Sequence, residues 1–208
     1  VYFLDVGQGD SELICLPNGT NILIDAGTTD GADELVRYLK DLGVAKIDCL
    51  IATHPHEDHI GGMTAVIHAF EIGNIYMPKV AANQTPTTKC YENMLDAIAK
   101  KGLKMTQGKG GMTVLNSGKT KLEFLAPNGS KYSDLNSYSI VAKLTLGGNR
   151  ILFTGDADTD SEKEMLKKGY DLRCDILKCG HHGSSTASSS AFLKAINPQY
   201  AIISCGVN

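Results

Sequence analysis

The chain has 208 residues, a length that suits one domain with a proper core, and 42% of its residues are hydrophobic, which is ordinary for a globular protein. Its 20 basic and 23 acidic residues give a formal net charge of −3, so no overall basic excess indicates a nucleic-acid binder. This balance weakens a nucleic-acid function without excluding it, because a pair of metal ions can itself hold a phosphate. No apolar stretch reaches about 18 residues, so we expect no membrane span in the chain.

Short β-branched runs alternate with helical patterns in the first half of the chain. The expected strands are 1–6, 21–27, 47–53 and 73–78. The expected helices are 31–43, 61–70 and 89–102. The polar stretch 81–90 is expected to form a surface loop and is a candidate to overhang a site.

The second half repeats this style. The expected strands are 113–118, 120–127, 174–180 and 200–206, with a hairpin over 138–156 that turns at 147–149. The expected helices are 160–169 and 189–198. Hairpins and βα units in both halves favour the α/β class, with two mixed sheets packed face to face and helices outside, in one domain over 1–208.

The six cysteines include no C-x-x-C pair. Four stand in apolar, strand-like runs, namely Cys15, Cys49, Cys179 and Cys205. We therefore expect small core residues with free thiols rather than a disulfide framework.

Four metal-binding side chains follow the strand 47–53 within six residues: His54, His56, Asp58 and His59. Loops after strands are where α/β proteins place their sites, and imidazole with carboxylate suits a borderline divalent cation. Adjacent Asp58 and His59 point differently from the other two, which favours two metal ions with one pair serving each. The alternative is a polar loop with chance histidines, although three of the chain's six histidines lie here.

The string H-x-H-x-D-H followed by Gly-Gly resembles the signature of the metallo-β-lactamase superfamily. Asp25 in NILIDAG, Asp156 in ILFTGDAD, and His181 or His182 in ILKCGHHGSS resemble its further motifs, in the family's order. The resemblance implies a four-layer αββα sandwich and a hydrolase that uses a metal-bridging hydroxide with two divalent ions, Zn²⁺ or Mn²⁺.

The resemblance also implies roles for these residues. One metal is expected on His54 and His56, the other on Asp58, His59 and His181, with Asp156 bridging and catalytic. Asp58 is also a candidate to protonate the leaving group. His181 is preferred as the ligand because it comes first after its strand, which leaves His182 to face the substrate. The reverse assignment, with His182 as the ligand, is the alternative. Asp25 is expected to orient the histidine loop, with a plain turn residue as the alternative.

Two strings, FLDVGQGDSELI and LKCGHHGSSTASSS, further resemble the hydrolase domain of ComEC-type DNA-uptake proteins and its free-standing relatives. Many superfamily members supply a mid-chain histidine that is absent here, since we interpret His68 as a structural or surface residue. The corresponding stretch LNSYSIV offers Asn136, as a weak oxygen ligand or holder of a water, and Ser139. Gly7 and Gly9 are expected to form a tight turn that brings Gln8 or Asp10 near the metals.

Ser184 and Ser185 lead into the helix 189–198, and hydroxyls with free backbone N–H groups at a helix start make an anion site. Simple helix capping is the alternative. Lys178, in the strand before, is interpreted either as attracting anions or as sitting at a sheet edge.

The leading hypothesis is a phosphodiesterase or nuclease acting on a phosphate-containing substrate, with single-stranded DNA as one candidate. The alternatives are hydrolysis of another ester (a phosphorylcholine ester, lactone or thioester) and a DNA-binding module of a DNA-uptake channel. The resemblance favours an extracellular or membrane-associated location over the cytoplasm, with attachment to a membrane channel in a longer protein. We also expect the chain to be truncated at its C-terminus.

Overall fold

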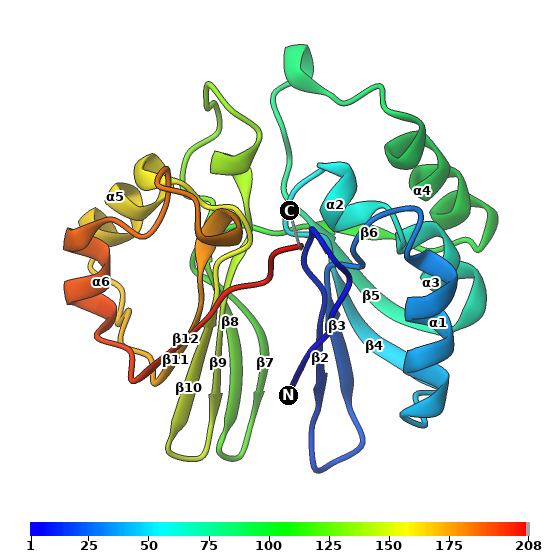
Figure 1. Ribbon diagram of the computed structural model, residues 1–208, viewed down its shortest axis with the longest axis horizontal. Coiled ribbons are helices and arrows are strands. Elements are labelled where there is room, and N and C mark those ends of the chain that lie inside the picture. The colour runs from blue at the N-terminus through cyan, green and yellow to red at the C-terminus, as the bar shows by residue number, and fades with distance from the viewer. Residues whose placement is uncertain (207–208) are drawn as a thin grey trace. The chain divides into compact units, whose positions relative to one another are not determined.

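The computed structural model describes residues 1–206 and divides into two compact units (Figure 1). The first unit comprises Val1–Met77 and Thr85–Gln107, together with the described end of the chain from Cys205. The second unit comprises Pro78–Gln84 and Gly108–Ser204. Each unit contains one six-stranded sheet with its own helices.

The sheet of the first unit follows the chain order from β1 to β6. Its strands are β1 (Tyr2–Phe3), β2 (Glu12–Cys15), β3 (Asn21–Ile24), β4 (Lys46–Ile51), β5 (Glu71–Met77) and β6 (Met105–Gln107). The first three strands pair antiparallel, and the pairs from β3 to β6 are parallel. Parallel central strands are normally buried on both faces, which explains the apolar runs at the carboxyl ends of β3 (residues 22–24) and β4 (residues 49–51).

The helices of the first unit share one core with this sheet. They are α1 (Ala32–Asp41), α2 (Glu57–Ile60), α3 (Met63–Ala69) and α4 (Lys89–Lys100). Leu35 and Leu39, one helical turn apart on α1, join Val66 of α3 and Ile98 of α4 against Leu50 of the sheet. This core holds the carboxyl end of β4, from which the histidine motif leaves.

The sheet of the second unit runs in the order β12-β11-β10-β9-β8-β7. Its strands are β7 (Met112–Ser117), β8 (Thr120–Ala126), β9 (Val141–Leu146), β10 (Asn149–Phe153), β11 (Ile176–Lys178) and β12 (Tyr200–Ile202). The strands β7 to β10 pair antiparallel, whereas β10, β11 and β12 are parallel. Because β10 and β11 run the same way, the segments that follow them leave the same edge of the sheet.

Two helices and three short 3₁₀ turns complete the second unit. The helices are α5 (Thr159–Lys168) and α6 (Ser190–Ile196), and the turns are η1 (Ala82–Gln84), η2 (Asn136–Tyr138) and η3 (Gly180–Gly183). Asp158 caps α5 by accepting from two backbone N–H groups of its first turn. Met165 of α5 and Phe192 of α6 share one buried core with Leu152 and Leu177 of the sheet.

The two mixed sheets and the α/β class confirm the fold predicted from the sequence. The differences are local. The helix expected at 61–70 is α3, and the short helix α2, which contains Asp58 and His59, precedes it without a counterpart among the expected elements. The strand expected at 1–6 is reduced to Tyr2–Phe3, and β6 has no counterpart among the expected elements.

All six cysteines are free thiols, as expected. The expectation that they are core residues was wrong for Cys15 and Cys205, which are exposed. Among residues 1–206, no helix is long and apolar enough to cross a membrane.

Candidate metal centre

The histidine motif lies in the first unit, where β4 ends and α2 begins. His54 and His59 are completely buried, whereas His56 and Asp58 are partly exposed. His56 is the residue before the helix, in extended conformation, and Asp58 and His59 lie within α2. The carboxylate of Asp58 lies 3.9 Å from His59 Nε2. The strand, loop and short helix therefore bring four metal-binding side chains into one stretch of the first unit.

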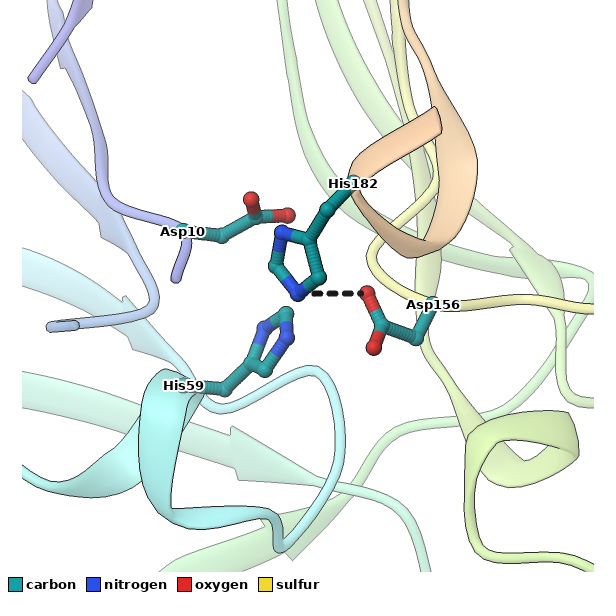
Figure 2. Close-up of side chains that lie close together, drawn as sticks. All are labelled: Asp10, His59, Asp156 and His182. Atoms are coloured by element: carbon teal, nitrogen blue, oxygen red, sulfur yellow. Dashed lines mark ion pairs between the residues drawn. The ribbon is translucent and has the colours of Figure 1, made fainter. Parts of the chain in front are cut away.

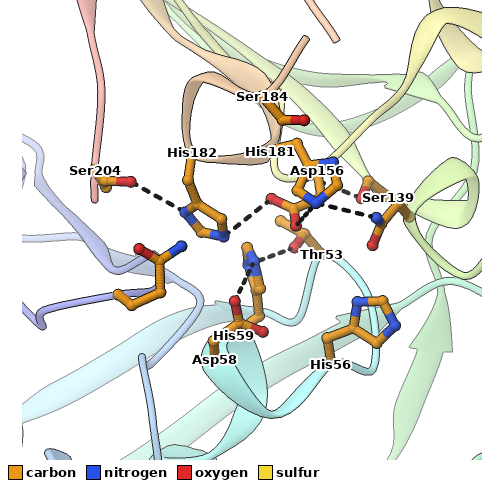
Figure 3. Close-up of polar contacts among 12 residues, drawn as sticks. Thr53, His56, Asp58, His59, Ser139, Asp156, His181, His182, Ser184 and Ser204 are labelled. Carbon is orange, nitrogen blue, oxygen red and sulfur yellow. Dashed lines mark hydrogen bonds and ion pairs between the residues drawn. The ribbon is translucent and has the colours of Figure 1, made fainter. Parts of the chain in front are cut away.

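A buried carboxylate and a hydroxyl tie the two ends of this motif together. Asp25, directly after β3, accepts hydrogen bonds from the Thr53 backbone N–H (2.7 Å) and from Thr53 Oγ1 (2.6 Å). The same Asp25 carboxylate lies 2.7 Å from His59 Nδ1. Burial raises the pKa of the Asp25 carboxyl, while its contacts with His59 and Thr53 act in the opposite direction. Figure 3 shows Thr53 and His59 side by side.

These contacts determine which nitrogens of the histidines carry protons. In its ionised form Asp25 can only accept, so His59 Nδ1 donates and the lone pair of the ring is on Nε2. Thr53 uses its one hydroxyl hydrogen toward Asp25, so at 3.1 Å it accepts from His54 Nδ1. The lone pair of His54 is therefore on Nε2 as well. Orienting ring nitrogens through their other N–H group is the usual arrangement around metal-binding histidines.

The spacing of His54 and His56 fits two ligands of one ion. His54 Nε2 lies 3.0 Å from His56 Nδ1, and the two rings meet edge to face. Two nitrogens bound at about 2.1 Å to one divalent ion lie roughly 3.0–3.4 Å apart for angles of 90–110°. The residues of the first unit thus fit a divalent cation both in donor chemistry and in spacing.

Asp10 lies beside this motif within the first unit. Its side chain is buried, and one of its carboxylate oxygens lies within 4.8 Å of a ring nitrogen of His59 (Figure 2). Its backbone N–H donates to the Asp58 carbonyl at 3.2 Å. Gly9 makes this approach possible, because a Cβ there would lie 2.3 Å from the same carbonyl oxygen. The sequence indicated Gln8 or Asp10, and the structure brings Asp10 to the histidines.

In the second unit, Asp156 follows β10 and is buried. Its backbone N–H donates to Ser139 Oγ at 3.1 Å. Its two carboxylate oxygens point to two different histidines: Oδ1 lies 3.6 Å from His182 Nε2, and Oδ2 lies 3.9 Å from His181 Nε2 (Figures 2 and 3). The second unit therefore gathers a carboxylate and two imidazoles.

His181 and His182 differ in how they are held. Both residues lie in the turn η3 and have left-handed backbone conformation, with φ of 50° and 52°. His182 Nδ1 lies 3.0 Å from the Ser204 carbonyl oxygen, which can only accept, so Nδ1 donates and Nε2 carries the lone pair. His181 Nδ1 lies 2.8 Å from Thr186 Oγ1. The His182 side chain is 7% exposed and that of His181 is 31% exposed.

The four side chains of the stretch Asn136–Ser139 each contact a different part of the second unit. Asn136 Nδ2 lies 3.5 Å from His181 Nε2, and Asn136 Oδ1 is buried with no hydrogen-bond partner in the described part of the chain. Ser137 donates to the capping carboxylate of α5, and Tyr138 receives the Ala81 N–H of the segment before η1. Ser139 supports Asp156, as above. The buried amide oxygen of Asn136 suits a hard cation or a water molecule.

Lys178 neither faces solvent, where it could attract anions, nor lies at a sheet edge, as the two interpretations from the sequence expected. Its side chain is completely buried and its ammonium donates to the Cys179 carbonyl at 3.0 Å. Its strand β11 lies between β10 and β12, so it is not at the sheet edge. A completely buried ammonium does not present its charge to a solvent-borne anion.

At the start of α6, where the sequence predicted an anion site, a carboxylate of the protein accepts two of the backbone N–H groups. Glu162 accepts from the backbone N–H groups of Ser188 (2.5 Å) and Ser189 (3.0 Å). Ser189 caps the helix by accepting from Phe192 N–H. Ser184 bonds Thr186, and Ser185 is exposed on the loop. Ser189 therefore caps the helix, in line with the alternative interpretation, and the role of Ser184 and Ser185 toward an anion stays a prediction.

Comparison with known proteins identifies the family. The family model described as the metallo-beta-lactamase superfamily matches residues 4–207. The chain belongs to the metallo-β-lactamase superfamily. At the level of this family it is a metal-dependent hydrolase, and the resemblance found in the motifs is confirmed.

The chain is similar to three curated proteins. It is 28% identical to ComE operon protein 3 of Bacillus subtilis (strain 168), over 100% of this chain and 28% of the relative. It is 35% identical to Competence protein ComA of Neisseria gonorrhoeae, over 97% of this chain and 26% of the relative. A shorter match, 35% identical over 30% of this chain and 12% of the relative, is to Ribonuclease J of Mycoplasma pneumoniae (strain ATCC 29342 / M129 / Subtype 1). The chain thus spans about a quarter of the length of the two competence-related proteins.

A solved structure agrees on the fold. The chain aligns with Tm1679, described as a metal-dependent hydrolase of the β-lactamase superfamily, with a TM-score of 0.57 and 15% identity, over 98% of this chain and 86% of that one. This likeness concerns the fold, because the sequences are far apart.

Sequence reasoning missed Thr53 and Thr186, which hold His54 and His181 in the two units. A threonine directly before the first histidine of the motif was a visible signal, since a hydroxyl at a strand end can bond the next ring. Thr186 had no such signal, because its contact with His181 arises only from the left-handed turn.

Proposed function

We propose that this chain is a phosphodiesterase that acts on nucleic acid and uses two divalent metal ions, Zn²⁺ or Mn²⁺. The observation that carries the proposal is the pair of orienting contacts on His54 and His59, because both rings are fixed with Nε2 as the lone-pair nitrogen, as metal ligands require. The competence-related relatives and the shorter match to a ribonuclease support a phosphodiester substrate.

We assign the ligands as follows. His54 and His56 serve one ion, Asp58, His59 and His182 serve the other, and Asp156 serves both. That the two sets serve the same pair of ions is supported by the family and by the order of its motifs along the chain.

Between the two neighbouring histidines, the contacts favour His182 as the ligand, which reverses the preference from the sequence. Its N–H is committed to a backbone carbonyl, which is the contact that orients metal-binding imidazoles. His181 is more exposed and its Nδ1 contacts the hydroxyl of Thr186, so we assign it the role of contacting the substrate. Asn136, whose amide faces His181, is assigned to the same role or to holding a water molecule.

When bound, the two ions supply a hydroxide nucleophile at neutral pH and neutralise charge on the phosphate. The chain's own residues prepare this chemistry. Asp25 and Thr53 keep the proton of each buried imidazole on Nδ1, which leaves Nε2 as the nitrogen that would bind a metal ion. Ser139 fixes the backbone at Asp156. Asp58, partly exposed and at the start of a helix, is our candidate to deliver a proton to the leaving oxygen.

The competence-related relatives also support a proposal for the process and the location in which the protein works. We place it in DNA uptake, with single-stranded DNA as the candidate substrate, outside the cell or at the membrane and attached to a membrane channel. The binding-module function differs from this proposal in one respect: DNA is bound and not cut. The ester functions differ in the bond that is cleaved.

The test is hydrolysis of bis(p-nitrophenyl) phosphate and of a fluorescent single-stranded DNA by metal-reconstituted protein. Asp58→Asn should lower the rate on both substrates by at least about 100-fold, the lower end of what general acid catalysis contributes. Asp96→Asn, a matched change at an exposed carboxylate of α4, should leave both rates unchanged. Wild-type protein that contains its metals, binds the DNA and cleaves neither substrate would contradict the phosphodiesterase and favour the binding module. Cleavage confined to a phosphorylcholine ester, lactone or thioester would favour the second enzyme function.

A further inference from the structure

A buried carboxylate of the first unit, that of Asp10, lies beside the histidine motif and has no role in the function proposed above. Asp10 is 1% exposed, and one of its carboxylate oxygens lies within 4.8 Å of a ring nitrogen of His59 (Figure 2). Asp25 holds the Nδ1 proton of His59, so Nε2 is the nitrogen that would bind an ion. Two atoms bound at about 2.1 Å to one divalent ion lie at most about 4.2 Å apart. Asp10 and His59 therefore need at most a small adjustment to bind the same ion.

The backbone of Asp10 is attached to the two segments that flank His59. Its N–H donates to the Asp58 carbonyl oxygen of α2 at 3.2 Å, and its own carbonyl oxygen accepts from the Gly27 N–H, in the loop after β3, at 2.9 Å. Gly9 permits this approach, because a Cβ there would lie 2.3 Å from the Asp58 carbonyl oxygen and its φ is +144°. These contacts hold the Asp10 carboxylate close to the imidazole.

The surroundings of His59 carry an excess of negative charge that a cation would balance. The Asp25 carboxylate lies 2.7 Å from His59 Nδ1, and the Asp58 carboxylate lies 3.9 Å from Nε2. Asp10 adds a third carboxylate around the same imidazole. Removing an ionised carboxylate from water is costly unless a positive charge accompanies it. A divalent ion at His59 Nε2 would supply that charge for both Asp10 and Asp58.

We propose, on the basis of the proposed function, that Asp10 is a further ligand of the ion that His59 serves and makes this position favour Mn²⁺ over Zn²⁺. The function proposed above already gives that ion four ligands: Asp58, His59, His182 and Asp156. Four protein ligands complete the tetrahedral set that is usual for zinc. With Asp10 the set has five members, three carboxylates and two imidazoles. A larger and oxygen-rich set suits the octahedral preference of Mn²⁺.

The test is metal binding by the full chain after its ions have been removed with a chelator. Bound Mn²⁺ is measured from the loss of the electron paramagnetic resonance signal of the free ion, and Zn²⁺ affinity by competition with a chromophoric chelator. Asp10→Asn keeps the shape of the side chain and removes its charge. It should weaken Mn²⁺ binding at one of the two positions by at least about 10-fold, since losing a group that merely orients a ligand already costs about 10–100-fold. Zn²⁺ affinity should fall by no more than about three-fold, because a tetrahedral ion keeps its four other ligands.

Two further variants and one further measurement separate a ligand from a residue that only supports the fold. Asp10→Ser also removes the carboxylate, with a smaller side chain, and should give the same selective loss of Mn²⁺. Asp33→Asn makes the same charge change at an exposed carboxylate of α1 and should leave both affinities within about two-fold of wild type. In EDTA, the thermal midpoint of Asp10→Asn, followed by circular dichroism, should be no lower than that of wild type, because the variant no longer buries a negative charge.

Mn²⁺ affinity equal to that of wild type in both Asp10 variants would overturn the inference. An equal fall in the affinities for both metals would also overturn it, because Asp10 would then favour neither metal, and a lower midpoint in EDTA would assign the loss to the fold. None of these measurements depends on catalysis. Selective loss of Mn²⁺ in a chain that binds both ions but cleaves no phosphodiester would support this role of Asp10 while contradicting the proposed function.

Discussion

At Thr53, a single hydroxyl connects the first and the last histidine of the motif. It accepts from His54 Nδ1 and donates to the Asp25 carboxylate that also receives His59 Nδ1. One buried carboxylate therefore orients two imidazoles, one of them through a relay. Through this relay Asp25, 28 residues before Thr53 in the sequence, contacts both ends of the histidine motif.

Replacing Thr53 with valine should weaken zinc binding by about 10–100-fold, the usual effect of losing a group that orients a metal ligand. Valine keeps the shape but lacks the hydroxyl, so His54 Nδ1 loses its acceptor. Competition with a chromophoric chelator measures the affinity. Thr53→Ser, which retains the hydroxyl, should stay close to wild type. Equal zinc affinity in the valine variant would contradict the relay.

Replacing His182 should affect metal retention, whereas replacing His181 should affect the rate of hydrolysis. His182→Ala should reduce the number of ions retained after dialysis, because its Nε2 is the oriented lone pair. His181→Ala should retain the ions of wild type and lose rate instead. Metal analysis by inductively coupled plasma mass spectrometry decides between them. The opposite result, metal lost with His181→Ala, would restore the assignment made from the sequence.

At the scale of elements, α2 depends on a close approach between its end and the loop after β3. A Cβ at Gly61 would lie 2.2 Å from Thr29 N and 2.6 Å from Glu57 O, both backbone atoms that cannot move easily. Glu57 in turn accepts from Thr29 N–H at 2.6 Å. The Gly-Gly after the histidines is therefore a packing requirement for the helix that carries Asp58 and His59.

Gly61→Ala should lower the free energy of unfolding by about 1–3 kcal/mol, as overpacking of a close contact does. Urea denaturation measures it. Gly148→Ala is the control, because nothing lies within 4 Å of a Cβ at that position and its φ is not left-handed. The control should change stability by no more than about 0.5 kcal/mol. If both variants unfold alike, the contact at Gly61 has no energetic importance.

The elements also show what sequence patterns can and cannot predict. The strand 47–53 and the helix 31–43 have strong periodicity and appear with small changes at their ends, as β4 and α1. The short helix α2 was not predicted, because its four residues are too few to show a helical period. The contact of Glu162 with the backbone before α6 was not predicted either, because Glu162 lies 26 residues before Ser188.

At the scale of the whole molecule, the motifs predicted the family and the fold because metal-binding residues in a fixed order are far more specific than composition. Residue roles within the site were less predictable. Thr186 and the Ser204 carbonyl, which orient the two late histidines, come from tertiary contacts with no pattern of their own.

The central claim is that one chain holds two metal ions. Native mass spectrometry of protein stripped with a chelator and then saturated with Zn²⁺ counts them directly. We predict two ions for the wild-type chain and one for the double variant His54→Ala, His56→Ala. A wild-type chain that saturates at one ion or none, or a double variant that still holds two, would contradict the account.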